Sequence, residues 1–185
     1  MAIRRLAALA LLAACLWAPR ASAQRVLEYE VKAAYLYNIV NFVTWPADAF
    51  NGPADPVRIC VYGADPFGPL LDRALQGGGP GQRPMVAVRV AVADVDSLAT
   101  CHLIFLPDGN TDRIDHAIRA AMQRPILIVG ESDDVLRRGG MIAFVIDAGR
   151  VRFDVNPAAA ASRGLLLSSR LLQVARSVLG KGRTS

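Results

Sequence analysis

Hydrophobic and polar positions repeat with a helical period over Glu28–Pro46, near the start of the chain. At about 100° per residue, most apolar side chains of this stretch fall on one broad arc of a helix. The arc contains Tyr29, Val31, Tyr35, Leu36, Ile39, Val40, Phe42 and Val43, and the polar side chains Glu30, Asn38, Asn41 and Thr44 gather opposite. Pro46 disfavours helical geometry at the residue before it, so we expect the helix to end at Trp45. An arc of this width predicts a helix that covers a large hydrophobic surface.

Lys32 interrupts the apolar arc, which a fully buried helix would not tolerate. Because it lies near the first turn, we expect its amine to reach water along the side-chain stem. Tyr37 and Trp45 lie at the edge of the arc and at the helix end. These two aromatic residues are therefore the predicted contacts with a partner surface.

After Pro46 the pattern alternates between short apolar strands and helices. The predicted strands are Val57–Tyr62, Met85–Val92, His102–Leu106 and Ile126–Val129, and the predicted helices are Asp65–Leu75, Val95–Ala99, Thr111–Gln123 and Val135–Arg138. Near-continuous apolar strands joined by helices indicate a mostly parallel sheet with helices on both faces. Only Met85–Val92 alternates valine with polar or small residues, which is typical of an edge strand.

The pattern changes in the last third of the chain. Met141–Ile146 and Val151–Val155 are predicted strands, and the link Asp147–Arg150 favours a hairpin. Asn156 and Pro157 then start a helix, and a last helix is expected over Ser169–Leu179. The sequence thus predicts a single α/β domain: a mostly parallel central sheet with a C-terminal antiparallel hairpin and helices on both faces.

Residues 1–23 have the features of a secretory signal peptide. Arg4 and Arg5 precede the apolar run Leu6–Trp17, and a small-residue cleavage site ends at Ala23. We expect a signal peptide over 1–23, a domain over 24–180, a frayed tail over 181–185, and a soluble periplasmic product. An alternative remains open, because the residues before Cys15 resemble a lipoprotein cleavage box and would give a lipid-anchored form.

Charge gives little indication of function once the leader is removed. Arg4, Arg5 and Arg20 leave with it, so 21 basic residues become 18 against 16 acidic, a net charge of +2. A net charge this small does not favour nucleic-acid binding.

Two cysteines, Cys60 and Cys101, remain after residue 23. An even number of cysteines in an exported protein favours a disulfide, and the alternative is two buried thiols. Whether such a bond is structural or a redox switch stays open.

No arrangement of side chains predicts an enzyme or a metal site. His102 and His116 are not at ligand spacing from another histidine or cysteine, so no metal or other cofactor is expected. The serines lie in no nucleophile motif. Acidic residues follow the predicted strands, where ligands of open α/β sheets bind, although such acids are more often simply solvated: Asp65, Asp108, Glu131, Asp133 and Asp134.

Five segments together resemble one family of exported bacterial proteins. They are EYEVKAAYLYNIVNFVTWP, RICVYGADPFG, CHLIFL, RPILIVGE and GGMIAFVIDAGRVRFDVNPAAAASRGLLLSSRLLQVAR. In this order and spacing they look like the YfiR family, over about Glu28 to Val178. The resemblance implies an α/β sheet flanked by helices, a non-enzymatic role and a tendency to form homodimers.

The resemblance also implies partners. The best-known members repress the periplasmic sensor domain of an inner-membrane diguanylate cyclase, and a sensor kinase is a related target. An outer-membrane peptidoglycan-binding lipoprotein can sequester such repressors, and reducing conditions weaken repression. A periplasmic small-molecule binding module remains the alternative function.

Only some of the residue roles known in the family can be carried over to this chain. Cys60 and Cys101 match the family's recurrent cysteine pair, but a second pair near 135–145 has no counterpart here. A two-disulfide redox scheme therefore does not transfer. Phe153 and Asn156 stand in the segment that the family keeps near its proposed small-molecule pocket, and they are the candidate pocket residues.

Overall fold

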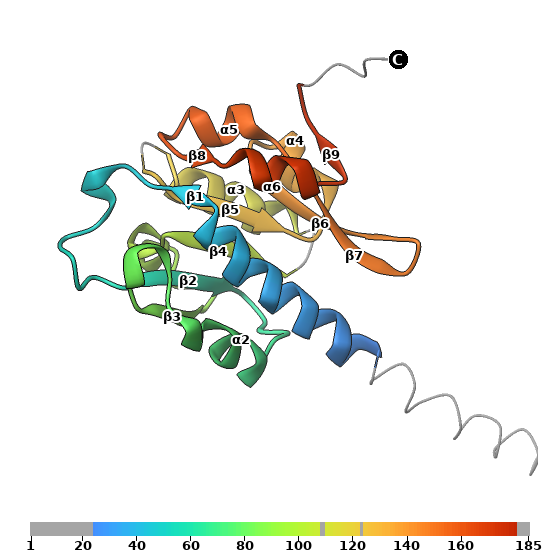
Figure 1. Cartoon of the computed structure of the whole chain (residues 1–185), viewed down its shortest axis with the longest axis horizontal. Helices are drawn as coiled ribbons and strands as arrows, with labels where there is room; N and C mark the ends of the chain where they lie inside the picture. Colours follow the sequence, from blue (N-terminus) through green and yellow to red (C-terminus); the bar gives the residue numbers. More distant parts are fainter. Residues whose placement is uncertain (1–23, 108–109, 123, 181–185) are drawn as a thin grey trace, which may run out of the picture.

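The computed structural model describes residues 24–107, 110–122 and 124–180. A seven-stranded sheet in the order β3-β2-β4-β5-β6-β7-β9 forms the centre of the molecule (Figure 1). Its strands are β2 Val57–Tyr62, β3 Met85–Val90, β4 Leu103–Leu106, β5 Leu127–Gly130, β6 Ile142–Asp147, β7 Arg150–Val155 and β9 Ser177–Val178. The predicted signal peptide, its cleavage site and the predicted tail lie outside the described residues.

The predicted fold class is confirmed. The first five strands of the sheet pair in parallel, and β7 then pairs antiparallel with β6. The hairpin turn uses Ala148 and Gly149, both at positive φ, which is the geometry that a tight two-residue turn requires. β3 lies at the edge, as its alternating valines predicted.

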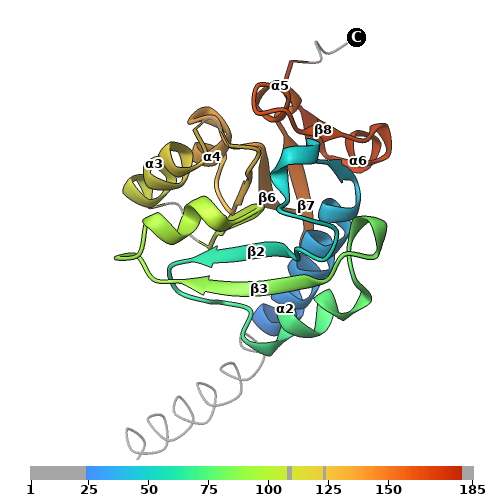
Figure 2. The same ribbon diagram turned by 90° about the vertical axis from the view of Figure 1, so that its left-hand side faces the viewer.

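Helices cover both faces of the sheet (Figure 2). One face packs against the N-terminal helix over residues 24–41, α2 Pro69–Ala74, α5 Pro157–Ala161 and α6 Ser169–Val174. The other packs against the 3-10 helix η4 Asp96–Thr100, α3 Thr111–Ala120 and α4 Asp133–Arg137. Shorter 3-10 turns lie in the loops: η1 Ala47–Ala49, η2 Leu75–Gly77 and η3 Pro80–Gln82. A hydrophobic core lies on each face of the sheet. Alternate residues of the central strands contribute to one core or the other, because successive side chains of a strand point to opposite faces.

The N-terminal helix ends earlier than predicted, at residue 41 instead of Trp45. Val43 and Thr44 form β1, which pairs antiparallel with β8, Leu166–Leu167. Branched side chains at Cβ suit this extended conformation better than a last helical turn. The buried arc is also narrower than predicted, because Val31 is exposed.

Other boundaries also differ from the prediction, most of all the start of one helix and the end of another. The helix expected from Asp65 begins only at Pro69, because the Asp65 carboxylate accepts the N–H of Phe67 and makes a turn that places the Phe67 ring in the core. The helix expected over Ser169–Leu179 stops at Val174. The backbone then extends into β9, which pairs in parallel with β7.

Candidate functional site

A cavity of about 460 Å³ opens at the carboxyl ends of the central strands, between the N-terminal helix and the loop after β5. Its polar lining is Glu28, Tyr29, Lys32, Glu131, Ser132 and Asp133, and β6 supplies the apolar wall Phe144, Val145 and Ile146. We call it the carboxyl-end cavity. Ligands of open α/β sheets bind at this edge, which makes it the first candidate site.

Lys32 lies at the centre of this cluster and does not reach water as predicted. It is only 4% exposed, and its ammonium bonds the carboxylates of Glu28 and Glu131, with an Nζ–Oε1 distance of 2.5 Å to Glu131. Glu28 precedes it by one helical turn, whereas Glu131 comes from the far end of β5. Burial is possible here because each partner supplies the charge that a buried ammonium needs.

Tyr29 completes the cluster. Its hydroxyl donates to the second oxygen of Glu131 at 3.2 Å, and its ring lies 4.5 Å from the Lys32 ammonium. Burial, reinforced by the negative charge of Glu131, raises the pKa of Tyr29 to about 12. The phenol therefore stays protonated and remains a donor.

Glu131 is held in a poorly solvated position. Its side chain is only 12% exposed, and burial raises its pKa although the Lys32 ammonium acts in the opposite direction. One paired ammonium therefore does not fully compensate this carboxylate for the loss of water.

The backbone around Glu131 explains its position. A Cβ on Gly130 would lie 2.4 Å from a methyl group of Val135, so only glycine lets α4 pack this closely on the end of β5. Glu131 directly follows Gly130, and its side chain reaches Lys32 of the N-terminal helix. In this close-packed turn the Ser132 hydroxyl oxygen is buried and makes no hydrogen bond within the described residues.

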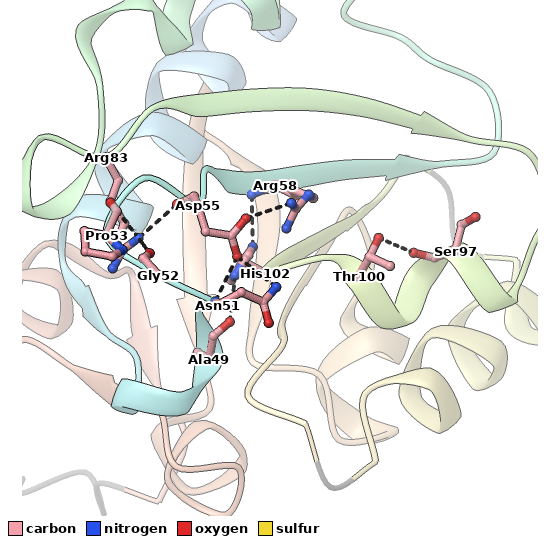
Figure 3. A network of polar contacts seen from close by, with 10 residues as sticks. All are labelled: Ala49, Asn51, Gly52, Pro53, Asp55, Arg58, Arg83, Ser97, Thr100 and His102. Carbon is pink, nitrogen blue, oxygen red and sulfur yellow. Dashed lines mark hydrogen bonds and ion pairs between the residues drawn. The ribbon is translucent and has the colours of Figure 1, made fainter.

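A second polar cluster lies at the opposite, amino end of the sheet (Figure 3). There Nδ1 of His102 accepts the backbone N–H of Arg58 at 3.1 Å, and Nε2 lies 3.0 Å from the carbonyl of Ala49. Because a backbone N–H can only donate, the ring proton belongs on Nε2 and the imidazole is neutral. Burial lowers the pKa of His102 and supports the same state.

The loop before β2 folds over this histidine. Phe50 stacks on the His102 ring at 4.4 Å between centroids, and the Arg83 guanidinium covers the other side of Phe50 at 4.0 Å. Arg83 also donates to the carbonyl groups of Gly52, Pro53 and Asp55. These contacts fix the loop, which borders an amino-end cavity of about 470 Å³.

The predicted disulfide between Cys60 and Cys101 is present, with 5.9 Å between the Cα atoms. It joins β2 to the residue before His102 and lies in the core beneath η4 and α3. Cys60 is fully buried, and Cys101 reaches the wall of the amino-end cavity. Disulfides persist in oxidising compartments, so this bond is consistent with an exported protein.

The four residues predicted to contact a partner or a ligand lie on different elements of the fold. Trp45 is 9% exposed and its indole N–H has no partner among the described residues, whereas Tyr37 is half-buried beside Gly77. Phe153 is a core residue that meets the Tyr35 ring, and Asn156 caps α5 by accepting the N–H of Ala159. Their roles in partner or ligand binding stay predictions.

The sequence alone singles out three residues of the carboxyl-end cavity without joining them. Lys32 interrupts the apolar arc, and Glu131 and Asp133 are among the acids that follow strands. The signal that could have joined them is a charge inside an apolar face, since such a charge requires an opposite charge elsewhere. Glu28, Tyr29 and Ser132 gave no signal of their own.

Within 24–107, 110–122 and 124–180, no group of three histidine, cysteine or acidic side chains is arranged to hold a metal ion. Over the same residues, no helix is both long and apolar enough to cross a membrane.

The solved structures that match this fold include the following two. A conserved domain protein from Vibrio cholerae O1 biovar El Tor str. N16961 is 16% identical with a TM-score of 0.57, over 81% of this chain and 60% of that chain. An ABC domain from Streptococcus pneumonia in complex with L-Trp is 12% identical with a TM-score of 0.48, over 66% of this chain and 55% of that one. The first likeness shows the fold alone, and the second is too distant to support a conclusion.

No curated protein sequence matches the chain. A family model described as YfiR/HmsC-like matches residues 29–176, a range that begins in the N-terminal helix and ends just before β9. That family is regulatory and non-catalytic and is associated with control of cyclic di-GMP. From the extent of this match, the chain belongs to the YfiR/HmsC-like family.

Proposed function

We propose that this protein is an exported regulator that binds the periplasmic sensor domain of an inner-membrane diguanylate cyclase and holds the cyclase inactive. The observation that carries the proposal is the family match over residues 29–176. The buried disulfide supports an oxidising compartment, since thiols are kept reduced in the cytosol.

The test is direct binding to the sensor domain of a cyclase or sensor kinase encoded beside this protein. Oxidised protein from Gln24 onward is immobilised, and the purified sensor domain is passed over it. Saturable association, together with a fall in cellular cyclic di-GMP when this protein is co-expressed with the full-length cyclase, is the expected result. Absence of association in both the oxidised and the reduced state would overturn the proposal.

Substitutions can locate the contact surface. Tyr37 is half-buried at the edge of the N-terminal helix, so Tyr37→Ala is expected to weaken association at least tenfold if the ring is a contact, the usual loss for an aromatic residue at an interface. Trp45→Phe tests the second candidate, because it keeps an aromatic ring at this buried position and removes the indole N–H. Met122→Ser is the matched control, because Met122 is exposed beside α3 on the opposite face. An equal effect of Tyr37→Ala and Met122→Ser would remove Tyr37 from the interface.

The proposal has three further parts, each with its own test: export of the protein, formation of a homodimer, and sequestration by an outer-membrane lipoprotein. Mass spectrometry of the mature protein is expected to find Gln24 at the N-terminus, whereas an acylated Cys15 would establish the lipid-anchored form. Light scattering of the oxidised protein tests the homodimer. Competition between the sensor domain and an outer-membrane peptidoglycan-binding lipoprotein tests sequestration.

A further inference from the structure

The carboxyl-end cavity adjoins an apolar groove. The groove has a volume of about 320 Å³ and runs between the first turns of the N-terminal helix and the β6–β7 hairpin. Its apolar lining is Leu27, Val31, Ile146 and Val151. Glu28 and Ile146 border both spaces, so the two form one continuous surface with an acidic end and an apolar end.

The acidic end carries more negative charge than Lys32 can neutralise. Glu28, Glu131 and Asp133 place three carboxylates on the wall of the carboxyl-end cavity, where Lys32 is the one cation of the lining; Arg25 and Arg176 act on Tyr29 and Asp133 from outside it. Lys32 bonds two of the carboxylates, and Asp133 is exposed at the rim. This excess favours a positively charged occupant.

The polar groups of this wall retain capacity for a ligand. Glu131 uses one oxygen for Lys32 and one for Tyr29, while a carboxylate has room for about four hydrogen bonds. The buried Ser132 hydroxyl makes no hydrogen bond within the described part of the chain. This oxygen is closed off from solvent, so the Glu131 and Asp133 carboxylates are the groups of this wall that a ligand can reach.

The apolar end is unusually exposed for large aliphatic side chains. Leu27 is 61% exposed and Ile146 is 55% exposed, on two elements that face each other across the groove. Arg150 lies at the hairpin end of the same groove. Its charge repels a cation there, so an amphipathic cation would place its charged group at Glu131 and its apolar body over Leu27 and Ile146.

We propose that the carboxyl-end cavity and the adjoining groove bind a small organic cation, namely a primary amine that carries an aromatic or aliphatic body. The ammonium sits between the Glu131 and Asp133 carboxylates, and the body covers Leu27, Val31 and Ile146. A space of about 460 Å³ is within the range of small-molecule sites. This site goes beyond the proposed regulatory function and does not depend on it.

The test uses three probes of one shape: phenethylamine, its neutral isostere 2-phenylethanol, and the anion phenylacetate. Calorimetry and thermal shift are measured on the oxidised chain from Gln24 onward, without any partner protein. Saturable binding of phenethylamine, at least tenfold stronger than that of the other two, is the expected result. Equal binding of all three probes, or no binding of phenethylamine at millimolar concentration, would overturn the proposal.

Single substitutions test which side chains contact the bound amine. Asp133→Asn changes only an exposed side chain and is expected to weaken phenethylamine binding several-fold. Glu131→Gln is expected to weaken it roughly tenfold or more, the size expected for losing a hydrogen bond to a charged group. Glu30→Gln is the matched control, because Glu30 is exposed on the same helix outside both spaces. Unchanged binding in both Asp133→Asn and Glu131→Gln would rule out this site.

The variant Lys32→Met/Glu131→Leu removes the buried ion pair without leaving a single charge behind. It keeps the protein measurable if Glu131→Gln alone does not fold, and binding should be lost in it. Because these measurements involve no cyclase, failure of amine binding leaves the proposed regulation standing. Failure of cyclase binding likewise leaves the amine site standing.

Discussion

The two ends of the sheet hold their buried ionisable groups in opposite ways. At the amino end, both ring nitrogens of His102 meet backbone groups and the imidazole is neutral. At the carboxyl end, Lys32 and Glu131 are buried as an ion pair beside surplus carboxylates and an unbonded serine hydroxyl. The first cluster satisfies its own hydrogen bonds, as a structural network does. The second has acceptors left over, as a binding site does.

The difference also separates stability from function. A neutral histidine bonded to the backbone costs little free energy to bury, and it fixes the loop before β2. A buried ion pair rarely stabilises a fold more than well-packed apolar residues would, so its presence calls for another reason. Changes at the amino end should therefore affect stability alone, whereas changes at the carboxyl end should affect both stability and ligand binding.

The largest expected effect is that of Lys32→Met. It leaves Glu131 buried without its cation, which should lower the free energy of unfolding by about 3–5 kcal/mol. Urea denaturation measures the loss. The double variant Lys32→Met/Glu131→Leu should recover most of it, and Glu30→Gln should stay within about 0.5 kcal/mol of the native protein. A double variant no more stable than Lys32→Met would show that packing, not charge, holds this end together.

Removal of the disulfide comes next. Cys60 and Cys101 are 41 residues apart, so Cys60→Ser should cost about 2–5 kcal/mol by restoring chain entropy to the unfolded state. The free energy of unfolding of the native protein should fall by a similar amount under reductant. The stability of Cys60→Ser should not change when reductant is added. A native protein whose midpoint ignores reductant would contradict a structural role.

Phe50→Leu tests the amino-end stack with a smaller change. Leucine keeps apolar bulk over His102 but loses the ring contacts, so unfolding should become easier by about 1 kcal/mol. Phenethylamine binding should be unaffected, because the stack and the carboxyl-end cavity lie at opposite ends of the sheet. Weaker amine binding in this variant would break the division between the two ends. Phe42→Leu, at the end of the N-terminal helix, is the control for losing an aromatic ring.

The smallest effect concerns pH and has opposite signs at the two ends. Burial lowers the pKa of His102, so its contribution to stability is present above the ordinary histidine pKa of about 6.5 and is lost as pH falls through the folded value. Burial raises the pKa of Glu131, so the stability that it contributes at acid pH is lost as pH rises through the folded value. Thermal melts between acid and neutral pH should therefore show a flatter acid-side decline of stability in His102→Asn than in the native protein.

Much of the sheet is predictable from sequence because its strands carry a local signal. Val57–Tyr62 was predicted with the bounds that the structure has, since an apolar run lies between Pro56 and Gly63. The two-residue strands β1, β8 and β9 carry no such signal. They exist because distant backbone segments pair, which periodicity cannot detect.

The candidate site was only half visible in the sequence. Lys32 could be recognised as anomalous, but Glu131 lies 99 residues further along the chain and no pattern links the two. The apolar groove beside them was hidden as well, because Val31 and Ile146 looked like ordinary members of a helix face and a strand. Their exposure depends on how the helix crosses the hairpin.

The small β1–β8 sheet has a consequence for how the chain acquires its structure. Val43 pairs with Leu167, and the Tyr29 hydroxyl meets a carboxylate 102 residues away, so the N-terminal helix is held by segments that are synthesised well after it. Contacts between such distant segments form slowly, because a long loop must close before they add any stability. The N-terminal helix is thus synthesised before the segments that hold it in place, and its packing must wait for them. A chain shortened before Leu166 would leave its apolar face without part of its cover.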